Sequence, residues 1–225
     1  MLNWSEMIYC RDQIHERYRK IWDVPLIKRR FSLIDRYIRP GMRLLDVGAG
    51  ERGVKDKIIK KYDNVIYKSM DIDRHLPHDY YSLDEIDEHF DFVLLLDVIE
   101  HLELEDGIKM LKRLNELLVN GGLLIITTPN IFNPSRFWLD ATHKVAYSYE
   151  ELGGILLSQG FEVLEIYRTF NASFPKYLLR LTLFYPLHRI LNVDFAKSIV
   201  ILAVKRRKFP RRVLRNGHQQ KKGTR

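Results

Sequence analysis

Residues 44–53 read Leu-Leu-Asp-Val-Gly-Ala-Gly-Glu-Arg-Gly, an apolar run that ends in an acid and then in closely spaced glycines. The apolar run predicts a strand, with Asp46 near its carboxyl end. Gly48 and Gly50 can take backbone angles that other residues rarely adopt, and without a Cβ they let a ligand lie against the main chain. Because ligands of open α/β sheets bind beyond the carboxyl ends of the strands, this segment predicts a cofactor crevice.

The same glycines leave two cofactor classes open. The spacing Gly48-x-Gly50-x-x-Gly53 matches the dinucleotide fingerprint, in which backbone N–H groups hold a pyrophosphate. Asp46 and Glu51 oppose that interpretation, because carboxylates repel a bound diphosphate and suit a cation. S-adenosylmethionine carries a sulfonium and an amino group, has no phosphate, and offers a ribose diol to a second acid. The flanking charges therefore favour S-adenosylmethionine.

Two further predicted strands also end in acids. Residues 64–70 precede Asp71, and the apolar run 90–96 precedes Asp97. Since the carboxyl ends of parallel strands meet at one edge of a sheet, we expect Asp46, Asp71 and Asp97 to converge there. Asp71 is then placed to accept hydrogen bonds from ribose hydroxyls.

Four segments taken together resemble class I S-adenosylmethionine-dependent methyltransferases over about residues 30–170. They are LLDVGAG (44–50), MDID (70–73), FDFVLLLDVIEHL (90–102) and GGLLIITTPN (121–130). Two later segments, THKVAYS (142–148) and QGFEV (159–163), are similar to small-molecule and glycan O-methyltransferases of the ubiquinone-biosynthesis type.

The resemblance implies an α/β fold with a doubly wound, mostly parallel seven-stranded sheet whose last strand is antiparallel. It implies that a methyl group is transferred by direct displacement to a sugar, a glycan or a lipid-linked small molecule. It also assigns the cofactor site. Asp46, Gly48 and Gly50 are expected beside the methionine part of S-adenosylmethionine, Asp71 and Ile72 at the ribose, and Asp97 near the methionine amino group.

Two histidines are candidate catalytic bases for an oxygen acceptor, because imidazole titrates near neutral pH. His143 lies in a polar loop with Asp140, which we expect to orient it, and His101 directly follows Glu100. A structural, hydrogen-bonded role is the alternative for both histidines. Carboxylates at strand ends bind sugar hydroxyls and amines as well as they bind metals, so we predict no metal.

Length and composition fit one α/β domain with extensions, since 225 residues with 46% apolar residues can bury one sizeable core. We expect an N-terminal helical extension over 1–24, lying over the cofactor edge, and a methyltransferase domain over 25–205. That domain should begin with a helix from Pro25 to about Tyr37 and carry a helical insertion at about 172–195. A basic, disordered tail is expected over 206–225.

The insertion mixes apolar and basic residues, and Pro186 should divide it into two short helices. Packing on the domain or on a second copy of the chain is one interpretation. The other is a cap at the membrane interface that admits a lipid-linked acceptor. Much of the net charge of +8 lies after residue 204. These basic residues form either a solvated tail or a contact site for anionic surfaces. No aromatic or zinc-finger signature accompanies it, which argues against nucleic acid.

The single cysteine, Cys10, and the lack of any run of about 18 apolar residues predict a cytoplasmic protein, with contact at the membrane periphery as an added option. Two other functional classes remain open. One is a nicotinamide-dependent oxidoreductase or epimerase, and the other is a methyltransferase-like module that binds without turnover. Stabilisation by NAD and not by S-adenosylhomocysteine would indicate the oxidoreductase. Transfer of a labelled methyl group would distinguish a methyltransferase from the binding module.

Overall fold

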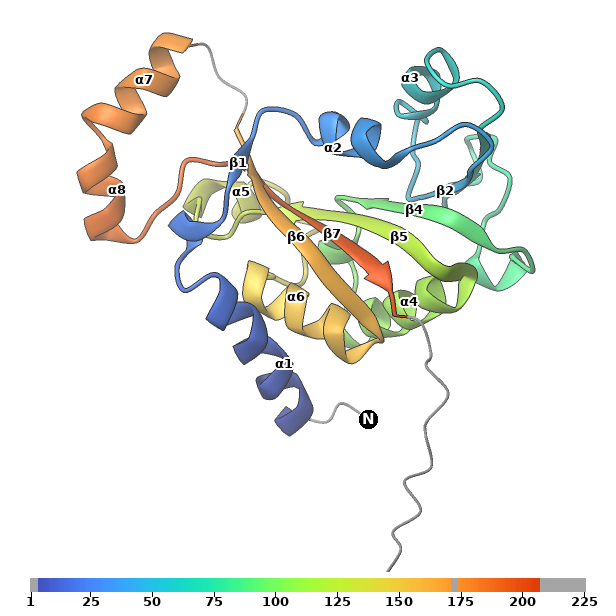
Figure 1. The fold of residues 1–225 in the computed structure, drawn as a ribbon, viewed down its shortest axis with the longest axis horizontal. Coiled ribbons are helices and arrows are strands. Elements are labelled where there is room, and N and C mark those ends of the chain that lie inside the picture. The colour runs from blue at the N-terminus through green and yellow to red at the C-terminus, as the bar shows by residue number, and fades with distance from the viewer. Residues whose placement is uncertain (1–3, 171–173, 207–225) are drawn as a thin grey trace, which may run out of the picture.

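The computed structural model describes residues 4–170 and 174–206. One sheet runs through the molecule, with helices on both faces (Figure 1). Its strands are β1 (Leu26–Ile27), β2 (Arg43–Val47), β3 (Ile66–Met70), β4 (Phe90–Leu96), β5 (Leu118–Pro129), β6 (Phe161–Thr169) and β7 (Ser198–Lys205). The helices are α1 (Trp4–Arg17), α2 (Arg30–Tyr37), α3 (Lys55–Ile59), α4 (Leu104–Leu117), α5 (Pro134–Trp138), α6 (Tyr149–Ser158), α7 (Phe174–Thr182) and α8 (Tyr185–Leu191). Short 3-10 turns are η1 (Ile21–Asp23), η2 (Leu83–Glu85) and η3 (Ile99–His101).

The sheet confirms the predicted architecture. Its seven strands follow the order β1-β6-β7-β5-β4-β2-β3. All neighbours are parallel except β7, which runs antiparallel to both β5 and β6. The carboxyl ends of β2, β4, β5 and β6 therefore share one edge, where the sequence predicted the cofactor crevice.

The prediction of a helix from Pro25 to about Tyr37 is wrong for its first residues. Leu26 and Ile27 form strand β1 against the edge of β6, and α2 begins only at Arg30. The Pro25 carbonyl accepts a hydrogen bond of 2.8 Å from the Arg168 amide, so the open edge of β6 holds this segment extended. The strand that completes the set of seven is thus β1, which precedes the glycine loop in the sequence. Residues 71–89 contribute only an isolated bridge between Tyr80 and Met70.

Helices α1, α4 and α6 cover one face of the sheet, and α2 and α3 cover the other (Figure 1). Helix α1 packs on α6 rather than over the cofactor edge, which corrects our expectation for the N-terminal extension. Two glycines of α6 permit this close approach. A Cβ on Gly153 would lie 2.9 Å from Cγ1 of Ile14, and one on Gly154 would lie 2.9 Å from the Arg11 amide nitrogen.

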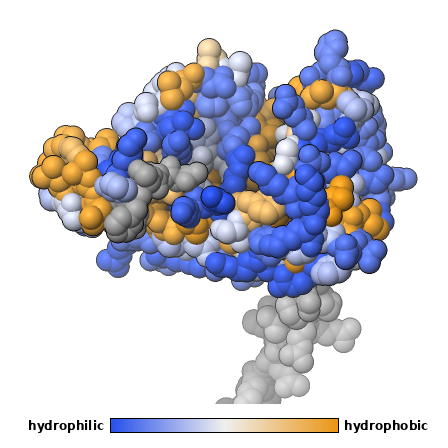
Figure 2. Space-filling view, turned by 90° about the horizontal axis from the view of Figure 1, so that it is seen from above, coloured by the Kyte–Doolittle hydropathy of each residue, from blue (hydrophilic) through white to orange (hydrophobic). Residues whose placement is uncertain are grey.

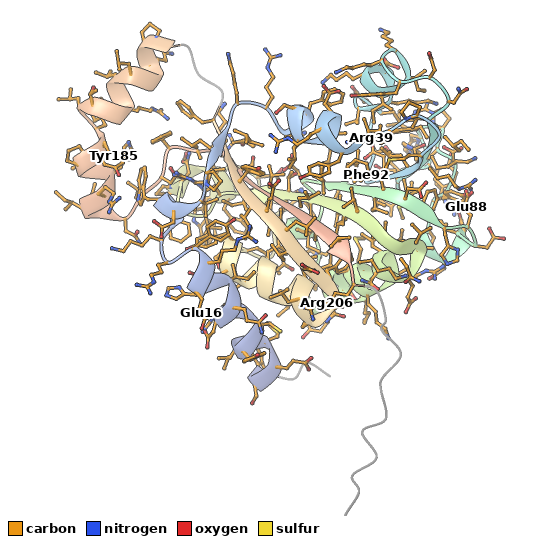
Figure 3. All side chains as sticks on the ribbon, in the orientation of Figure 1. Glu16, Arg39, Glu88, Phe92, Tyr185 and Arg206 are labelled. Atoms are coloured by element: carbon orange, nitrogen blue, oxygen red, sulfur yellow. The ribbon has the colours of Figure 1, made fainter. Side chains whose placement is uncertain are left out.

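Residues 174–191 form two helices that project from one end of the molecule, and we call them the α7–α8 arm (Figure 1). Pro186 stands in the first turn of α8, so the predicted division at this proline is confirmed. Figure 2 shows hydrophobic residues gathered over the arm, and Tyr185 marks it in Figure 3 at the opposite end from Glu88. The predicted basic tail beyond residue 206 lies outside the described residues.

Candidate functional site

A pocket of about 600 Å³ opens at the carboxyl edge of the sheet. The loop after β2, helix α2, the end of β4, helix α5 and the first residues of β7 surround it. The lining residues are Lys28, Arg29, Arg30, Phe31, Ile34, Asp46, Gly48, Ala49, Gly53, Val54, Lys57, Leu96, Asp97, Arg136, Thr169, Lys197 and Ser198.

Gly48 shapes the wall of the pocket. Its φ of 70° lies in the left-handed region, and its amide donates a 2.8 Å hydrogen bond to the Met70 carbonyl. A Cβ at this position would lie 2.3 Å from Cγ2 of Val98, in the turn after β4. The loops after β2 and β4 therefore meet only because residue 48 has no side chain.

Asp46 lies at the floor of the pocket and is 2% exposed. The Tyr67 hydroxyl donates a 2.5 Å hydrogen bond to one of its carboxylate oxygens. Burial raises the pKa of Asp46 to about 6, and the negative charge of Asp71 adds to that rise, while the Tyr67 hydrogen bond and the charge of Arg30 oppose it. A carboxylate held in this way is poorly solvated and gains from a nearby cationic ligand.

Asp97 forms an ion pair with Arg30 in the pocket wall. The Thr127 hydroxyl donates a 2.8 Å hydrogen bond to the other carboxylate oxygen, and the Asp97 backbone has a φ of 57°. The pocket thus presents a fixed anion beside a fixed cation. No local pattern singled out Arg30, because it stands inside a predicted helix among other basic residues.

The other predicted cofactor residues lie outside the pocket lining. One oxygen of Asp71 accepts a 2.8 Å hydrogen bond from the Gly50 amide, and the other accepts a 3.0 Å bond from the Asp73 amide. Asp71 therefore tethers the glycine loop and keeps lone pairs for a ligand. Because Val47 pairs with Met70 in the register of β2 and β3, Asp46 and Asp71 lie at the same edge of the sheet. Ile72 is 82% exposed.

The two candidate bases lie together, with ring centroids 4.7 Å apart, although neither lines the pocket. The Thr142 hydroxyl donates to Asp140 over 2.7 Å and lies 2.9 Å from Nδ1 of His101. Since that hydroxyl proton is already donated, Nδ1 of His101 must carry the proton and Nε2 is left with its lone pair. Asp140 thus contacts His101 through Thr142, and our expectation that it orients His143 stays a prediction.

His143 is held differently. Its Nδ1 lies 2.7 Å from the Phe137 carbonyl, which can only accept, so Nδ1 carries the proton here as well. Nε2 lies 4.0 Å from a carboxylate oxygen of Asp140, and the side chain is 8% exposed. Both rings therefore keep an Nε2 lone pair, the form that a general base requires.

Glu100 completes a cluster that the sequence did not foresee. Its side chain is fully buried, and burial raises the pKa of the carboxyl group to about 8, with a smaller contribution from the charge of Asp97. Neither carboxyl oxygen has a hydrogen-bond partner within the described part of the chain. Ligand atoms of Glu100, His101 and His143 all lie within 4.8 Å of one another. The spacing is compatible with a metal ion, and a protonated Glu100 is the alternative, so the prediction of no metal stays a prediction.

The pocket is more basic than the sequence suggested. Six of its lining residues are basic and two are acidic. Glu51, which we used as an argument against a diphosphate, does not line the pocket. Within the described ranges, Arg30 is the only lining cation with an ion pair. Of the two acids in the charge argument from the sequence, Asp46 therefore lines the pocket and Glu51 does not, and most of the charged residues in the wall are basic.

A second cavity of about 560 Å³ lies beneath the α7–α8 arm. Its wall combines apolar and basic side chains: Asn133, Pro134, Lys176, Leu179, Arg180, Phe184, His188, Val193, Asp194 and Phe195. A buried ion pair of 2.9 Å between Arg168 and Asp194 anchors the segment that returns from the arm to β7. Both cavities use α5 and the segment before β7, so they are neighbours.

The sequence matches the family described as "Methyltransferase domain" over residues 15–166. This range includes the glycine loop, the strand ends that carry the acids, and the two histidines. No curated protein matches the chain.

Several solved structures share the fold. A SAM-dependent methyltransferase from Archaeoglobus fulgidus has 21% identity and a TM-score of 0.64, with 78% of this chain and 91% of that chain covered. An S-adenosylmethionine-dependent methyltransferase from Mesorhizobium loti has 14% identity and a TM-score of 0.57, covering 77% and 96%. Phosphoethanolamine N-methyltransferase 2 of Haemonchus contortus, solved with S-adenosylmethionine, has 15% identity and a TM-score of 0.54, covering 79% and 52%.

Proposed function

Because the chain belongs to the methyltransferase domain family, we propose that it is an S-adenosylmethionine-dependent O-methyltransferase that acts on a lipid-linked sugar or other lipid-linked small molecule. The observation that carries the cofactor assignment is the pocket wall at the ends of β2 and β4. There a buried acid, a glycine without room for a Cβ, and an ion pair lie side by side. The family membership favours this activity over the nicotinamide-dependent alternative.

The residues of this wall fit the cofactor in charge. The amino-acid end of S-adenosylmethionine carries an ammonium and a carboxylate group, and Asp97 and Arg30 offer the opposite charges next to each other. Asp46 places a buried carboxylate nearby, where a cation is favoured. Asp71, beside the glycine loop, is the acceptor for the ribose hydroxyls.

S-adenosylmethionine supplies a methyl group on a sulfonium, which leaves as a neutral thioether without further activation. The protein must therefore hold the acceptor oxygen in line with that methyl group and keep water away. A hydroxyl acceptor loses its proton as the new C–O bond forms. His101 takes this proton at Nε2, with Asp140 and Thr142 fixing the ring and His143 packed against it.

The second cavity supports a lipid-linked acceptor within the sugar, glycan and lipid-linked classes that the sequence suggested. Leu179, Phe184 and Phe195 line it, so it can take an apolar chain next to the catalytic pocket. The α7–α8 arm above it exposes further apolar side chains, with Leu183 at 68% and Ile190 at 80% exposed. An acceptor bound to a lipid could enter from that side.

We also propose that the arm rests on an anionic membrane surface. Residues 174–193 include Lys176, Arg180, His188 and Arg189 but no acidic residue, so their charge complements anionic lipid. Exposed leucines and the exposed Ile190 on the same arm suit the apolar part of the interface. No helix in the described ranges is long and apolar enough to cross a membrane.

Vesicle sedimentation tests the membrane contact. Vesicles of phosphatidylcholine with phosphatidylglycerol should bind the protein, and phosphatidylcholine alone should bind it less. Replacing Leu183 and Ile190 together with serine should weaken binding about tenfold, since the buried methylene groups are lost. Ile59→Ser, a matched change at an exposed residue of α3, should leave binding unchanged. Equal binding by both variants would contradict the proposal.

Binding and turnover test the main function separately. Thermal shift should show stabilisation by S-adenosylhomocysteine and none by NAD. Transfer of a labelled methyl group from S-adenosylmethionine to lipid extracts, followed by mass spectrometry, should reveal a product heavier by one methylene unit. Binding without any transfer would favour the non-catalytic module, and stabilisation by NAD alone would favour an oxidoreductase.

A further inference from the structure

We propose that the acceptor side of the pocket is a phosphate subsite, in which Arg136, Lys197 and Lys28 hold a phosphate group of the methyl acceptor. This inference rests on the proposed function, because it adds a recognition element to the acceptor of that reaction. It begins from the uneven distribution of charge over the pocket wall.

The sheet order separates the two signs of charge. Asp46 and Asp97 belong to β2 and to the turn after β4, which are neighbours in the sheet. Lys28 follows β1, Lys197 precedes β7, and Arg136 lies on α5 after β5. In the order β1-β6-β7-β5-β4-β2-β3, these three cations therefore stand over one half of the sheet, whereas the acids stand over the other half together with Arg30 and Lys57.

Backbone hydrogen bonds also bring the segments that carry Lys28 and Lys197 together. Ile27, next to Lys28, pairs with Thr169 in the parallel register of β1 and β6. The Lys197 amide donates a 2.9 Å hydrogen bond to the Thr169 carbonyl. Thr169 and Ser198 line the pocket between these residues, which adds two hydroxyl groups to the same wall.

None of these three cations forms an ion pair with any residue in 4–170 or 174–206. Arg136 is the most telling of them. Its Nε is shielded from solvent and has no hydrogen-bond partner among the described residues, although the side chain lines the pocket. A guanidinium keeps its charge because it is not deprotonated in proteins, so Arg136 is an uncompensated cation in the pocket wall and favours an anionic ligand.

The chemistry of the ligand follows from the charges. S-adenosylmethionine is itself cationic and does not neutralise this half of the pocket. A phosphate dianion offers several oxygens to one guanidinium and two ammonium groups, and arginine binds it in a bidentate manner. The second cavity adjoins this wall and is largely apolar, so it suits the remainder of a phosphorylated lipid.

Calorimetry with defined probes tests the subsite. Phenyl phosphate is titrated into protein that is already saturated with S-adenosylhomocysteine. Arg136→Gln and Lys197→Gln should each weaken its binding about tenfold, because each removes one charged hydrogen bond. Lys112→Gln, an equal change of charge at an exposed residue of α4 outside both cavities, is the control and should bind as the unaltered protein does.

Octyl phosphate distinguishes the two sources of the group. Tighter binding than phenyl phosphate supports a phosphorylated lipid, and equal binding supports a soluble phosphate ester. If phenyl phosphate binds all variants equally, or binds no better than benzyl alcohol, the subsite is overturned while the methyltransferase assignment stands. If S-adenosylhomocysteine itself fails to bind, the proposed function fails instead, and this inference falls with it.

Discussion

The two halves of the pocket differ in how the chain builds them. At the ends of β2 and β4, the wall comes from short contiguous segments, and Asp46 there is 2% exposed. At the ends of β1, β5 and β7, exposed or half-buried side chains from distant parts of the sequence form the wall. The difference suggests that the chemistry shared by the family is stored in local motifs, whereas recognition of the acceptor depends on how separate segments are brought together.

Gly48→Ala should have the largest effect, because it acts on the tightly packed half. The new Cβ would overlap Cγ2 of Val98 and would require a left-handed backbone, so we expect a loss of about 3 kcal/mol in unfolding free energy. Binding of S-adenosylhomocysteine should fall below detection. Chemical denaturation and calorimetry measure the two effects.

Gly41→Ala is the matched control for this change. Gly41 has a φ of 80°, but a Cβ there would meet nothing within 4 Å. It should therefore cost only about 1 kcal/mol of backbone strain and leave cofactor binding intact. A similar loss in both variants would show that the contact with Val98 is unimportant. Adding Val98→Ala to Gly48→Ala should recover part of the stability.

Glu100 lies between the two halves and should make stability depend on pH. Its pKa is raised to about 8 in the folded protein from an ordinary value of 4.5. Its stabilising contribution is complete below pH 4.5 and is lost as pH rises towards 8, because the unfolded chain releases this proton in that range while the buried carboxyl group keeps it. Glu100→Gln should remove this dependence and, between pH 5 and 9, reduce the change in unfolding free energy by about 4 kcal/mol.

Guanidinium denaturation at several pH values measures that difference. Glu105→Gln, at an exposed position of the following helix, should keep the pH dependence of the unaltered protein. An unchanged curve for Glu100→Gln would mean that this carboxyl group is ionised and compensated in the fold.

Replacing either histidine should slow turnover with little effect on cofactor binding. His101→Ala should lower kcat about 100-fold, since a general base contributes on that scale. His143→Ala should slow turnover less, because His143 acts by supporting the His101 ring. His89→Ala, at an exposed site, should change nothing. Normal turnover in both His101→Ala and His143→Ala would exclude them as the base, and a shifted pH–rate profile in either would support the assignment.

Asp71→Ala should produce a smaller, purely binding effect. It removes the ribose acceptor and the tether to the Gly50 amide, so affinity for S-adenosylhomocysteine should fall about tenfold. Asp73→Ala leaves that tether in place and should have much less effect. Equal losses would place the ribose contact elsewhere in the loop.

Metal removal should have the smallest effect of all. We expect dialysis against EDTA to leave methyl transfer and cofactor binding unchanged, because a neutral Glu100 carboxyl needs no cation. Loss of activity that a divalent ion restores, and that Glu100→Gln abolishes, would instead identify the Glu100, His101 and His143 cluster as a metal site.

The residues whose place in the fold agrees with the sequence share one property, which is that local pattern determines their position, while their role in cofactor binding stays a prediction. Asp46 and Asp97 follow apolar runs, and Gly48 stands where a strand breaks, so strand periodicity and turn chemistry placed them at the sheet edge. The antiparallel last strand was also correct, but through the family resemblance rather than through its own residues.

The features that escaped prediction depend on tertiary pairing. Leu26 and Ile27 are too few to show alternation, and Pro25 before them is typical of a helix start, so only the open edge of β6 makes them a strand. Nothing in the local sequence distinguishes Arg136 and Lys197 from ordinary surface residues. Their convergence depends on the sheet order, and the link from Asp140 to His101 depends on a hydroxyl rotor of Thr142.

Among the strands that the structure describes, β7 comes last in sequence, yet it lies inside the sheet between β5 and β6. During synthesis on the ribosome, the β1–β6 pair therefore has no strand that joins it by hydrogen bonds to β5 until residues 198–205 have emerged. A chain truncated before residue 198 would lack the strand that joins β6 to β5, so the two sides of the pocket would separate. Loss of an edge strand would only make the sheet narrower.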